Sequence, residues 1–282
     1  MRQSQSTGMS APLRRALGLP AGARLAPVLA CALLAACTTT TTTTNRLSEP
    51  IGSEPINNVD AAAINVQLGV SYLQKNDLSL AQTKLQRALT ENPHSVDVHD
   101  ALALLDERLG DAKGADREYR RALALSQRSP QELNNYAVFL CSHGRPTEGV
   151  RYFEEAAVNP LYATPWAAYT NAGICLRGVH QDDAAMERFT RALQIDPAFA
   201  DAALEAASLE FAQQHLVAAR LRIDLFLMSN RPTPALLLLG WQVARAQSDA
   251  VGQQRYALLL ARDFPNSPQA HALEQASRSG AG

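Results

Sequence analysis

The feature that most constrains the fold is an internal repeat of about 34 residues, which begins near position 62 and runs almost to the C-terminus. Small residues recur at nearly constant spacing, at Gly69, Ala103, Ala137, Gly173, Ala207 and Gly240. Twelve positions after each of them comes a second small residue, namely Ala81, Ala115, Gly149, Ala185, Ala219 and Gly252. Four positions later comes a large apolar residue, namely Leu85, Tyr119, Phe153, Phe189, Ile223 and Tyr256. Small residues let two helices approach closely and the large side chain fills the space between them, so each unit is predicted to be a helical hairpin.

Residues that favour turns lie where this pattern needs them. The turns within hairpins are predicted at Asn76-Asp77, Gly110-Asp111 and Gly144-Arg145. The ends of units are predicted at Asn92-Pro93, Asn159-Pro160, Asp196-Pro197 and Phe264-Pro265. Glycine and asparagine tolerate tight turns and proline cannot continue a helix, which supports both sets of boundaries.

The first unit, from Ala62 to Ser95, resembles the tetratricopeptide repeat. It carries the key residues of that repeat at Leu68, Gly69, Tyr72, Ala81, Leu85, Ala88 and Pro93. The resemblance implies an all-α fold: a right-handed superhelical solenoid of about six tetratricopeptide hairpins, with an inner face built mainly from the first helix of each pair. Units five and six fit less well, with Glu210 at the place of Tyr72 and Phe226 at the place of Ala88.

Residues 1–36 are predicted to be a lipoprotein signal peptide. Arg14, Arg15 and Arg24 precede an apolar run from Leu25 to Ala36. This run is too short to cross a bilayer, since a spanning helix needs about 20 residues. It ends in Leu34-Ala35-Ala36-Cys37, which resembles the bacterial lipobox, whose cysteine is acylated. The alternative, that Cys37 is an ordinary small residue of the signal, stays open, as does the choice between Met1 and Met9 as the start of translation.

The lipoprotein resemblance also implies the destination of the chain. Asp after the acylated cysteine is typical of retention in the inner membrane, whereas Thr38 follows Cys37 here and implies the outer membrane. Residues 37–60, with their tract of threonines, are predicted to be a lipidated flexible tether that leaves the rest facing the periplasm. The solenoid is expected over residues 61–275 and a disordered tail over 276–282.

Composition and charge narrow the class of protein. The formal net charge is −1 and the pI is about 6.6, which argues against the long basic stripe of a nucleic-acid-binding protein. Aromatic residues make up only 6% of the chain, and alanine is abundant, which favours closely packed helices over a β-sandwich. A monomer is expected, with no nucleic-acid partner and no small-molecule substrate.

After export, Cys141 and Cys175 are the two cysteines that remain beside Cys37. They lie one repeat apart, on the predicted first helices of units three and four. An even pair of thiols in an oxidising compartment predicts a disulfide. The alternative is two buried free cysteines. A zinc site is disfavoured because His143, which is close to Cys141 in sequence, would point to another face of the helix.

No catalytic or cofactor-binding motif is present in the sequence. The chain lacks a Gly-x-Ser-x-Gly elbow, a phosphate-binding Gly-x-x-x-x-Gly-Lys loop and a His-Glu-x-x-His motif, and most of its six histidines are expected to be solvated. The repeats also leave almost no chain from which to build an active site. The sequence therefore predicts no enzyme, no metal and no cofactor, although an enzyme with an unfamiliar site is kept as an alternative.

Recognition by a groove is the function that the repeats leave. The residues predicted to line it lie on the first helices of units one to four, and four of them, Val70, Leu104, Val138 and Ile174, occupy one equivalent place in consecutive units. An apolar row flanked by amides suits a helix or an extended peptide. The predicted lining residues are Gln67, Val70, Leu73, Gln74, Asp100, Leu104, Asn134, Asn135, Val138, Thr170, Asn171 and Ile174. The alternative for each is a place in the core between units.

Two blocks are more particular than the general repeat: residues 133–145, LNNYAVFLCSHGR, and residues 171–178, NAGICLRG. They resemble the PilF or PilW family of type IV pilus biogenesis lipoproteins, and the resemblance extends over the chain after the signal. It implies a pilotin, which helps the outer-membrane secretin of the pilus reach its membrane and multimerise, and so supports twitching motility. An anchored adaptor for peptidoglycan hydrolases or for outer-membrane protein assembly is the alternative.

Overall fold

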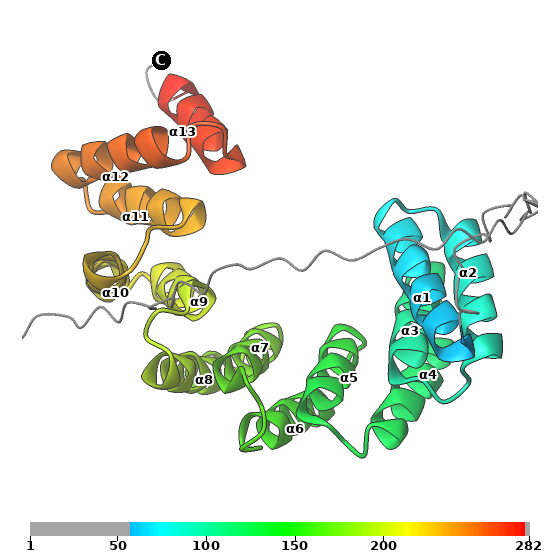
Figure 1. Ribbon diagram of the computed structural model, residues 1–282. Helices are drawn as coiled ribbons and strands as arrows, with labels where there is room; N and C mark the ends of the chain where they lie inside the picture. The colour runs from blue at the N-terminus through cyan, green and yellow to red at the C-terminus, as the bar shows by residue number, and fades with distance from the viewer. Residues whose placement is uncertain (1–56, 280–282) are drawn as a thin grey trace, which may run out of the picture. The chain divides into compact units, whose positions relative to one another are not determined.

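The computed structural model describes residues 57–279, which fold into thirteen α-helices without a strand. The first twelve form six consecutive hairpins (Figure 1). Their bounds are α1 (Asn58–Gln74) with α2 (Leu78–Glu91), α3 (Val96–Leu109) with α4 (Ala112–Leu125), α5 (Pro130–Ser142) with α6 (Pro146–Ala157), α7 (Pro165–Arg177) with α8 (Asp182–Ile195), α9 (Ala200–Ala212) with α10 (Leu216–Ser229), and α11 (Pro234–Ala246) with α12 (Ala250–Asp263). The last helix, α13 (Pro268–Ser279), follows the sixth hairpin.

Seven of the described helices begin at a side chain that satisfies one of their first backbone N–H groups. The N-cap side chains that accept such a hydrogen bond are those of Asn57, Asp77, Ser95, Asp111, Ser129, Thr233 and Asp249. Proline stands in the first turn of α5, α6, α7 and α11, where its missing N–H costs nothing. Local sequence therefore sets most of the helix starts.

Each hairpin turn contains one residue in the left-handed region of backbone space. Glycine supplies it at Gly110 and Gly144, but the other four turns use Asn76, His180, Gln214 and Ser248. These six positions recur with the period of the repeat itself. The turn geometry is thus common to all six units although its sequence is not.

The small-to-large pairing predicted from the repeat is present inside the hairpins. A Cβ atom placed on Gly69 would lie 2.5 Å from the side chain of Leu85, and one on Gly173 would lie 2.5 Å from Phe189. The equivalent distance from Gly240 to Tyr256 is 2.7 Å. Real Cβ atoms do not approach so closely, so a larger residue at these crossings would force the fully buried side chain beside it to shift.

Helices contact only their neighbours along the chain. Every pair of helices with Cα atoms within 8 Å of each other is separated by no more than one other helix. This is the arrangement of a solenoid, in which stability comes from stacking consecutive units, and it confirms the predicted all-α tetratricopeptide solenoid. None of the described helices is long and apolar enough to cross a membrane.

The structure corrects two predicted boundaries. The solenoid begins at Asn58 because Asn57 caps α1, so the last residues assigned to the tether are helical. The tail expected from residue 276 is helical up to Ser279, at the end of α13. Ala270 and Leu273 of α13 are buried against the last units, so this thirteenth helix covers an apolar surface that the twelve-helix prediction left open. The signal segment, Cys37 and most of the tether lie outside the described residues.

Candidate functional site

The apolar row predicted for the groove lies on the first helices and is largely open to solvent. Leu104, Val138 and Ile174 are each close to half exposed, and Val70 is partly buried. The row does not form one continuous channel. Val70 and Leu104 line a cavity between α1 and α3, whereas Val138 and Ile174 line another between α5 and α7.

The cavity between α1 and α3 has a volume of about 270 Å³ and will be called the α1–α3 cavity. Its apolar walls are formed by Ala63, Val66, Val70, Ala101 and Leu104. Its polar lining consists of the Gln67 amide and the carboxylates of Asp97 and Asp100. The cavity can therefore hold an apolar stem and a polar end at the same time.

Asp100 stands at the edge of this cavity, facing α5. Its Oδ2 accepts a hydrogen bond of 3.3 Å from Asn135 Nδ2, and its Oδ1 is buried without a hydrogen-bond partner among the described residues. Burial, followed by the nearby carboxylate of Glu132, raises the pKa of Asp100 to about 6, although the bond from Asn135 acts in the opposite sense. Asp100 is thus a carboxylate whose charge the described residues do not neutralise.

The cavity between α5 and α7 has a volume of about 320 Å³ and lies against the disulfide. The predicted pair, Cys141 and Cys175, is joined in the structure, with the two Cα atoms 5.7 Å apart. Asn171 Nδ2 also donates a hydrogen bond of 3.0 Å to Asn134 Oδ1 across the same two helices. These two amides were predicted to bind a partner, and here they bond to each other.

Two of the predicted groove residues do not line the groove. Leu73 is buried in the core of the first hairpins, with Leu85 and Leu102. Thr170 is 2% exposed, and its Oγ1 donates a hydrogen bond of 2.8 Å to the carbonyl of Trp166. Both predictions were wrong because the predicted groove lining included too wide a face of each first helix. These two residues lie on the sides of their helices that pack against neighbouring helices. Gln67 and Gln74 are exposed, as a groove requires.

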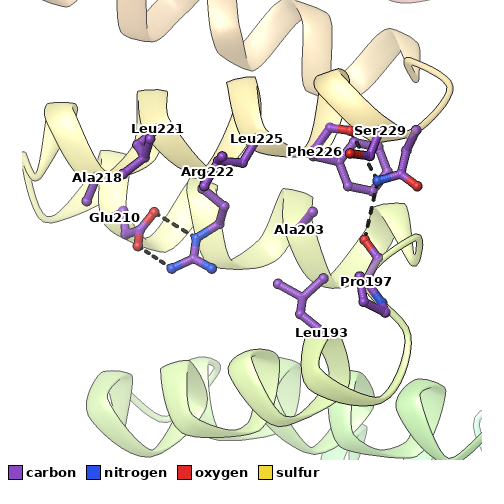
Figure 2. A pocket seen from close by; sticks show the side chains of 11 residues that line it. Leu193, Pro197, Ala203, Glu210, Ala218, Leu221, Arg222, Leu225, Phe226 and Ser229 are labelled. Carbon is purple, nitrogen blue, oxygen red and sulfur yellow. Dashed lines mark hydrogen bonds and ion pairs between the residues drawn. The ribbon is translucent and has the colours of Figure 1, made fainter. Parts of the chain in front are cut away.

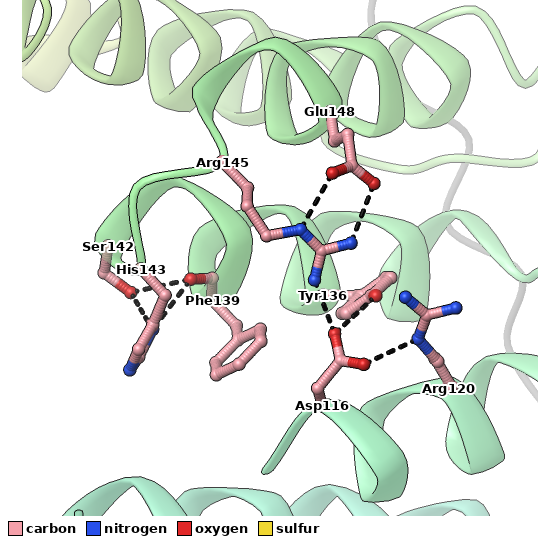
Figure 3. A network of polar contacts seen from close by, with 8 residues as sticks. All are labelled: Asp116, Arg120, Tyr136, Phe139, Ser142, His143, Arg145 and Glu148. Carbon is pink, nitrogen blue, oxygen red and sulfur yellow. Dashed lines mark hydrogen bonds and ion pairs between the residues drawn. The ribbon is translucent and has the colours of Figure 1, made fainter. Parts of the chain in front are cut away.

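A polar hub connects α4, α5 and the start of α6 (Figure 3). The carboxylate of Asp116 accepts hydrogen bonds from Tyr136 at 2.8 Å and from Arg145 and Arg120 at 2.7 Å each. Arg145 also donates to both oxygens of Glu148 at 2.8 Å. The sequence analysis did not find this hub, since its residues come from three helices and follow no short motif.

The hub shifts the titration of its members. Burial alone would raise the pKa of Asp116, but its hydrogen bonds from Tyr136, Arg145 and Arg120 outweigh burial and hold that pKa below its ordinary value. Burial, together with the Asp116 carboxylate, raises the pKa of Tyr136 to about 12. At neutral pH the carboxylate is therefore charged and the phenol is neutral, which is the state that these hydrogen bonds need.

A further cavity, of about 420 Å³, lies among α8, α9 and α10 (Figure 2). Leu193, Ala203, Leu221, Leu225 and Phe226 give it a mainly apolar lining. At one end Arg222 reaches from α10 to Glu210 of α9 and binds both carboxylate oxygens, at 2.9 and 2.5 Å. This ion pair explains why Glu210 replaces the aromatic residue expected in the repeat.

The outer side of α10 is unlike that of α8. All of the exposed residues of α10 are uncharged: Val217, Ala218, Leu221, Leu225, Met228 and Ser229. The exposed residues of α8 are instead Asp183, Glu187, Thr190, Arg191, Gln194 and Ile195. The spacing of the apolar residues of α10, at 217, 221, 225 and 228, is a signal that the sequence analysis overlooked.

The structure also locates the residues considered for chemistry. Five of the six histidines are exposed, as expected, and His99 is the exception. It is buried, and its ring lies 2.6 Å from Glu118 Oε2 and 3.0 Å from the carbonyl oxygen of Pro93. The described residues contain no group of three His, Cys, Asp or Glu side chains placed to hold a metal ion. The features that the described residues bring together are open cavities between neighbouring helices.

Comparisons with known proteins place this architecture. No protein-family model matches the chain. The type IV pilus assembly protein PilF of Pseudomonas aeruginosa is 34% identical over 202 residues, which cover 72% of this chain and 80% of PilF. A solved structure of Pseudomonas aeruginosa PilF, at 32% identity, has a TM-score of 0.58 and covers 78% of this chain and 99% of its own.

Two other solved structures extend the comparison. PilW, described as a widely conserved type IV pilus biogenesis factor, is 28% identical, has a TM-score of 0.58 and covers 75% of this chain and 97% of its own. A tetratricopeptide repeat protein of Parabacteroides merdae has a TM-score of 0.55 at 17% identity, covering 78% of this chain and 84% of its own, and shares the fold alone.

Proposed function

Because the chain belongs to the PilF family of type IV pilus assembly proteins, we propose that it is a pilotin that binds a segment of the pilus secretin. It is a tetratricopeptide protein of type IV pilus biogenesis, and this fold and family are those of protein-interaction scaffolds. The observation that carries the proposal is the row of half-exposed apolar residues along the first helices, with a cavity at each end. An extended or helical segment could place apolar side chains in both cavities.

The proposed mechanism requires no chemistry at the site. Acylated Cys37 would hold the tether in the outer membrane, and the solenoid would hold the secretin segment on the periplasmic side. Several acyl chains anchor firmly because each buried methylene contributes about 0.8 kcal/mol. Tethering raises the local concentration of the bound segment near the bilayer, so secretin subunits would meet one another and the membrane more often.

The groove is tested by placing charges in it. The double variant Val138→Asp, Ile174→Asp should lose capture of the secretin, because two carboxylates would replace apolar contacts on the α5–α7 side. Val251→Asp on the outer side of α12 is a matched control, since Val251 is exposed and lies outside both cavities. The measurement is a pull-down with purified secretin, together with the circular dichroism spectrum of each variant. Retained binding by a folded double variant would contradict the groove assignment.

The anchor and the pathway need cellular measurements. Cys37→Ala should move the protein from the outer-membrane fraction to the soluble fraction and reduce secretin multimers and twitching motility. Unchanged fractionation would contradict lipidation. Deletion of the gene distinguishes the remaining alternative: normal secretin multimers with altered cell shape would favour an adaptor for peptidoglycan hydrolases.

A further inference from the structure

The boundary between the first helices of two consecutive units will be called a seam. The seam between α3 and α5 carries negative charge that the described residues do not pair in a salt bridge. Three carboxylates lie at this seam: Asp97 and Asp100 on α3 and Glu132 on α5. Asp97 and Glu132 are close enough to Asp100 to raise its pKa. None of the three makes an ion pair within residues 57–279. At the seam between α7 and α9, by contrast, Glu205 pairs with Arg177 at 2.7 Å. The seam between α3 and α5 therefore has the carboxylates of an ion pair without the cation.

The other groups that face Asp100 form no ion pair with it. On α3 itself, His99 acts to lower the pKa of Asp100, as the weakest of the effects on it, and its ring is bonded to Glu118 and to the Pro93 carbonyl. On α5 the neighbour is the neutral amide of Asn135, and from α1 the cavity is lined by the neutral amide of Gln67. On α4 the nearby group is the Tyr119 phenol, which donates to Glu107.

The α1–α3 cavity is shaped for a long side chain with a charged end. Val66, Val70 and Leu104 offer apolar walls, and Asp97 and Asp100 stand at its polar side. Lysine and arginine bury their methylene stems against apolar surface and keep the charged group beside polar partners. Asp97 is exposed and can meet such a group directly, whereas Oδ1 of Asp100 is buried without a hydrogen-bond donor among the described residues, so Asp100 would attract the cation through its charge.

We propose that the partner of this protein inserts a basic side chain, lysine or arginine, into the α1–α3 cavity, where Asp100 and Asp97 receive it. The proposal rests on the proposed function in taking the partner to be a secretin segment, and it adds the chemistry of that segment: a basic residue with apolar neighbours. The charge complementarity of the cavity favours this occupant over a wholly apolar segment, which would leave both carboxylates desolvated without a counter-charge.

The binding test uses synthetic overlapping peptides of the secretin from the same genome, measured by fluorescence anisotropy against the purified protein. Peptides that bind should contain lysine or arginine, and replacing that residue by glutamine should weaken binding about tenfold or more. Asp100→Asn should cause a similar loss, whereas Asp201→Asn, which changes an exposed carboxylate on α9, should change binding less than about twofold. Equal binding by wild type and Asp100→Asn would overturn the proposal.

The pH dependence gives a second readout. A cation bound beside Asp100 requires the ionised carboxylate, so the wild-type affinity should be constant well above pH 6 and fall as the pH drops towards 6 and below. The Asp100→Asn variant should lose this dependence while remaining folded. A variant that keeps the same pH profile as wild type would show that Asp100 does not receive the cation.

A third measurement separates this proposal from the proposed function. The pentapeptide Ala-Leu-Lys-Leu-Ala should shift the side-chain carboxyl resonance of Asp100 in an NMR titration and lower its pKa, and the glutamine version should do neither. If no secretin peptide binds but the lysine peptide acts in this way, the partner assignment fails and the basic-residue site stands. The opposite outcome is also possible: secretin peptides bind, the double variant Val138→Asp, Ile174→Asp abolishes that binding, and the lysine and glutamine pentapeptides behave alike. In that case the proposed groove stands and the basic-residue site fails.

One further occupant is tested in the same experiment. Arg46 precedes the described residues and is a basic residue flanked by Leu47. If Arg46→Gln changed the Asp100 carboxyl resonance of the protein without any peptide, the chain's own segment would occupy the cavity and the proposal would be wrong. Unchanged resonances in Arg46→Gln are expected.

Discussion

The seam between α3 and α5 and the seam between α5 and α7 join units of the same repeat by different means. The first helices α5 and α7 have Cα atoms within 8 Å of each other and are linked by the Cys141–Cys175 disulfide. No Cα atom of α3 lies within 8 Å of one in α5, and these two helices are linked by the hydrogen bond from Asn135 to Asp100. The repeat therefore fixes the hairpins more closely than it fixes the seams.

The cause of the wider seam lies in the linker and the hub. Gln127 and Arg128, between α4 and α5, both have positive φ, and within the described residues no other linker between units has this feature. Arg128 binds Glu155 of α6 through both carboxylate oxygens. The second and third units are thus also joined through α4, α5 and α6, around Asp116, while α3 and α5 stay apart except for the hydrogen bond from Asn135 to Asp100.

The disulfide offers the largest expected effect. Cys141→Ser should lower the free energy of unfolding by about 3–4 kcal/mol under oxidising conditions, because the bridge closes a loop in the unfolded chain across a sequence separation of 34. Chemical denaturation with and without dithiothreitol measures this change. In reductant the variant and wild type should unfold alike; an equal loss in both conditions would mean that serine disturbs packing and that the bridge is not the cause.

Removing the hub should have the next largest effect. Asp116→Ala should lower the free energy of unfolding by about 2–3 kcal/mol, since it leaves Arg145 and the Tyr136 hydroxyl without their shared acceptor. Glu148→Ala is the control: it removes an exposed partner of Arg145, whose pair is screened by solvent, and should have a much smaller effect. Thermal unfolding followed by circular dichroism measures both variants. Equal effects would contradict the prediction that Asp116 stabilises the contact between these units.

Asp100→Asn should make the protein more stable. The folded pKa of about 6 lies above the unfolded value of 3.8, so the folded state binds more protons between these values and loses stability as pH rises through this window. Asparagine removes that cost, and we expect a gain of about 1–2 kcal/mol at pH 7.5 after allowance for solvent screening, and no gain below pH 4. Urea unfolding at both pH values measures the difference; a loss of stability at pH 7.5 would contradict it.

The smallest expected effect concerns the linker. Gln127→Gly should raise the free energy of unfolding by about 0.5–1 kcal/mol, because glycine adopts positive φ without the steric cost of a side chain. Arg128→Gly relieves the same kind of strain but removes the pair with Glu155, so its net effect should be close to zero. Equal gains in both variants would mean that the ion pair contributes nothing to this seam.

The hairpins could be predicted from the sequence because their packing uses residue types that recur at one spacing. Gly69 with Leu85 and Gly173 with Phe189 are legible as small and large positions, and the structure places them in contact. The turns at His180, Gln214 and Ser248 were harder to predict from the sequence. The repeat imposes a left-handed backbone conformation there, and these amino acids give no signal of it. Tertiary context overrides local preference there.

The candidate site was only partly predictable for a different reason. The period of the first helices identified Val70, Leu104, Val138 and Ile174, but it could not show that these residues divide between two cavities. That division depends on the seam between α3 and α5, which is set by Arg128 and by residues of the hub that are distant in sequence. Pairwise contacts such as Arg222 with Glu210 likewise follow from the positions of helices and not from any motif.

The restriction of contacts to neighbouring helices has a mechanical consequence. A chain pulled by its two ends should give way one hairpin at a time, because no contact between distant units shares the load. The bridge from Cys141 to Cys175 spans a sequence separation of 34, so it would remove about 110 Å of extended chain from the length that can be drawn out. The third and fourth units would thus stay linked longest under such a load.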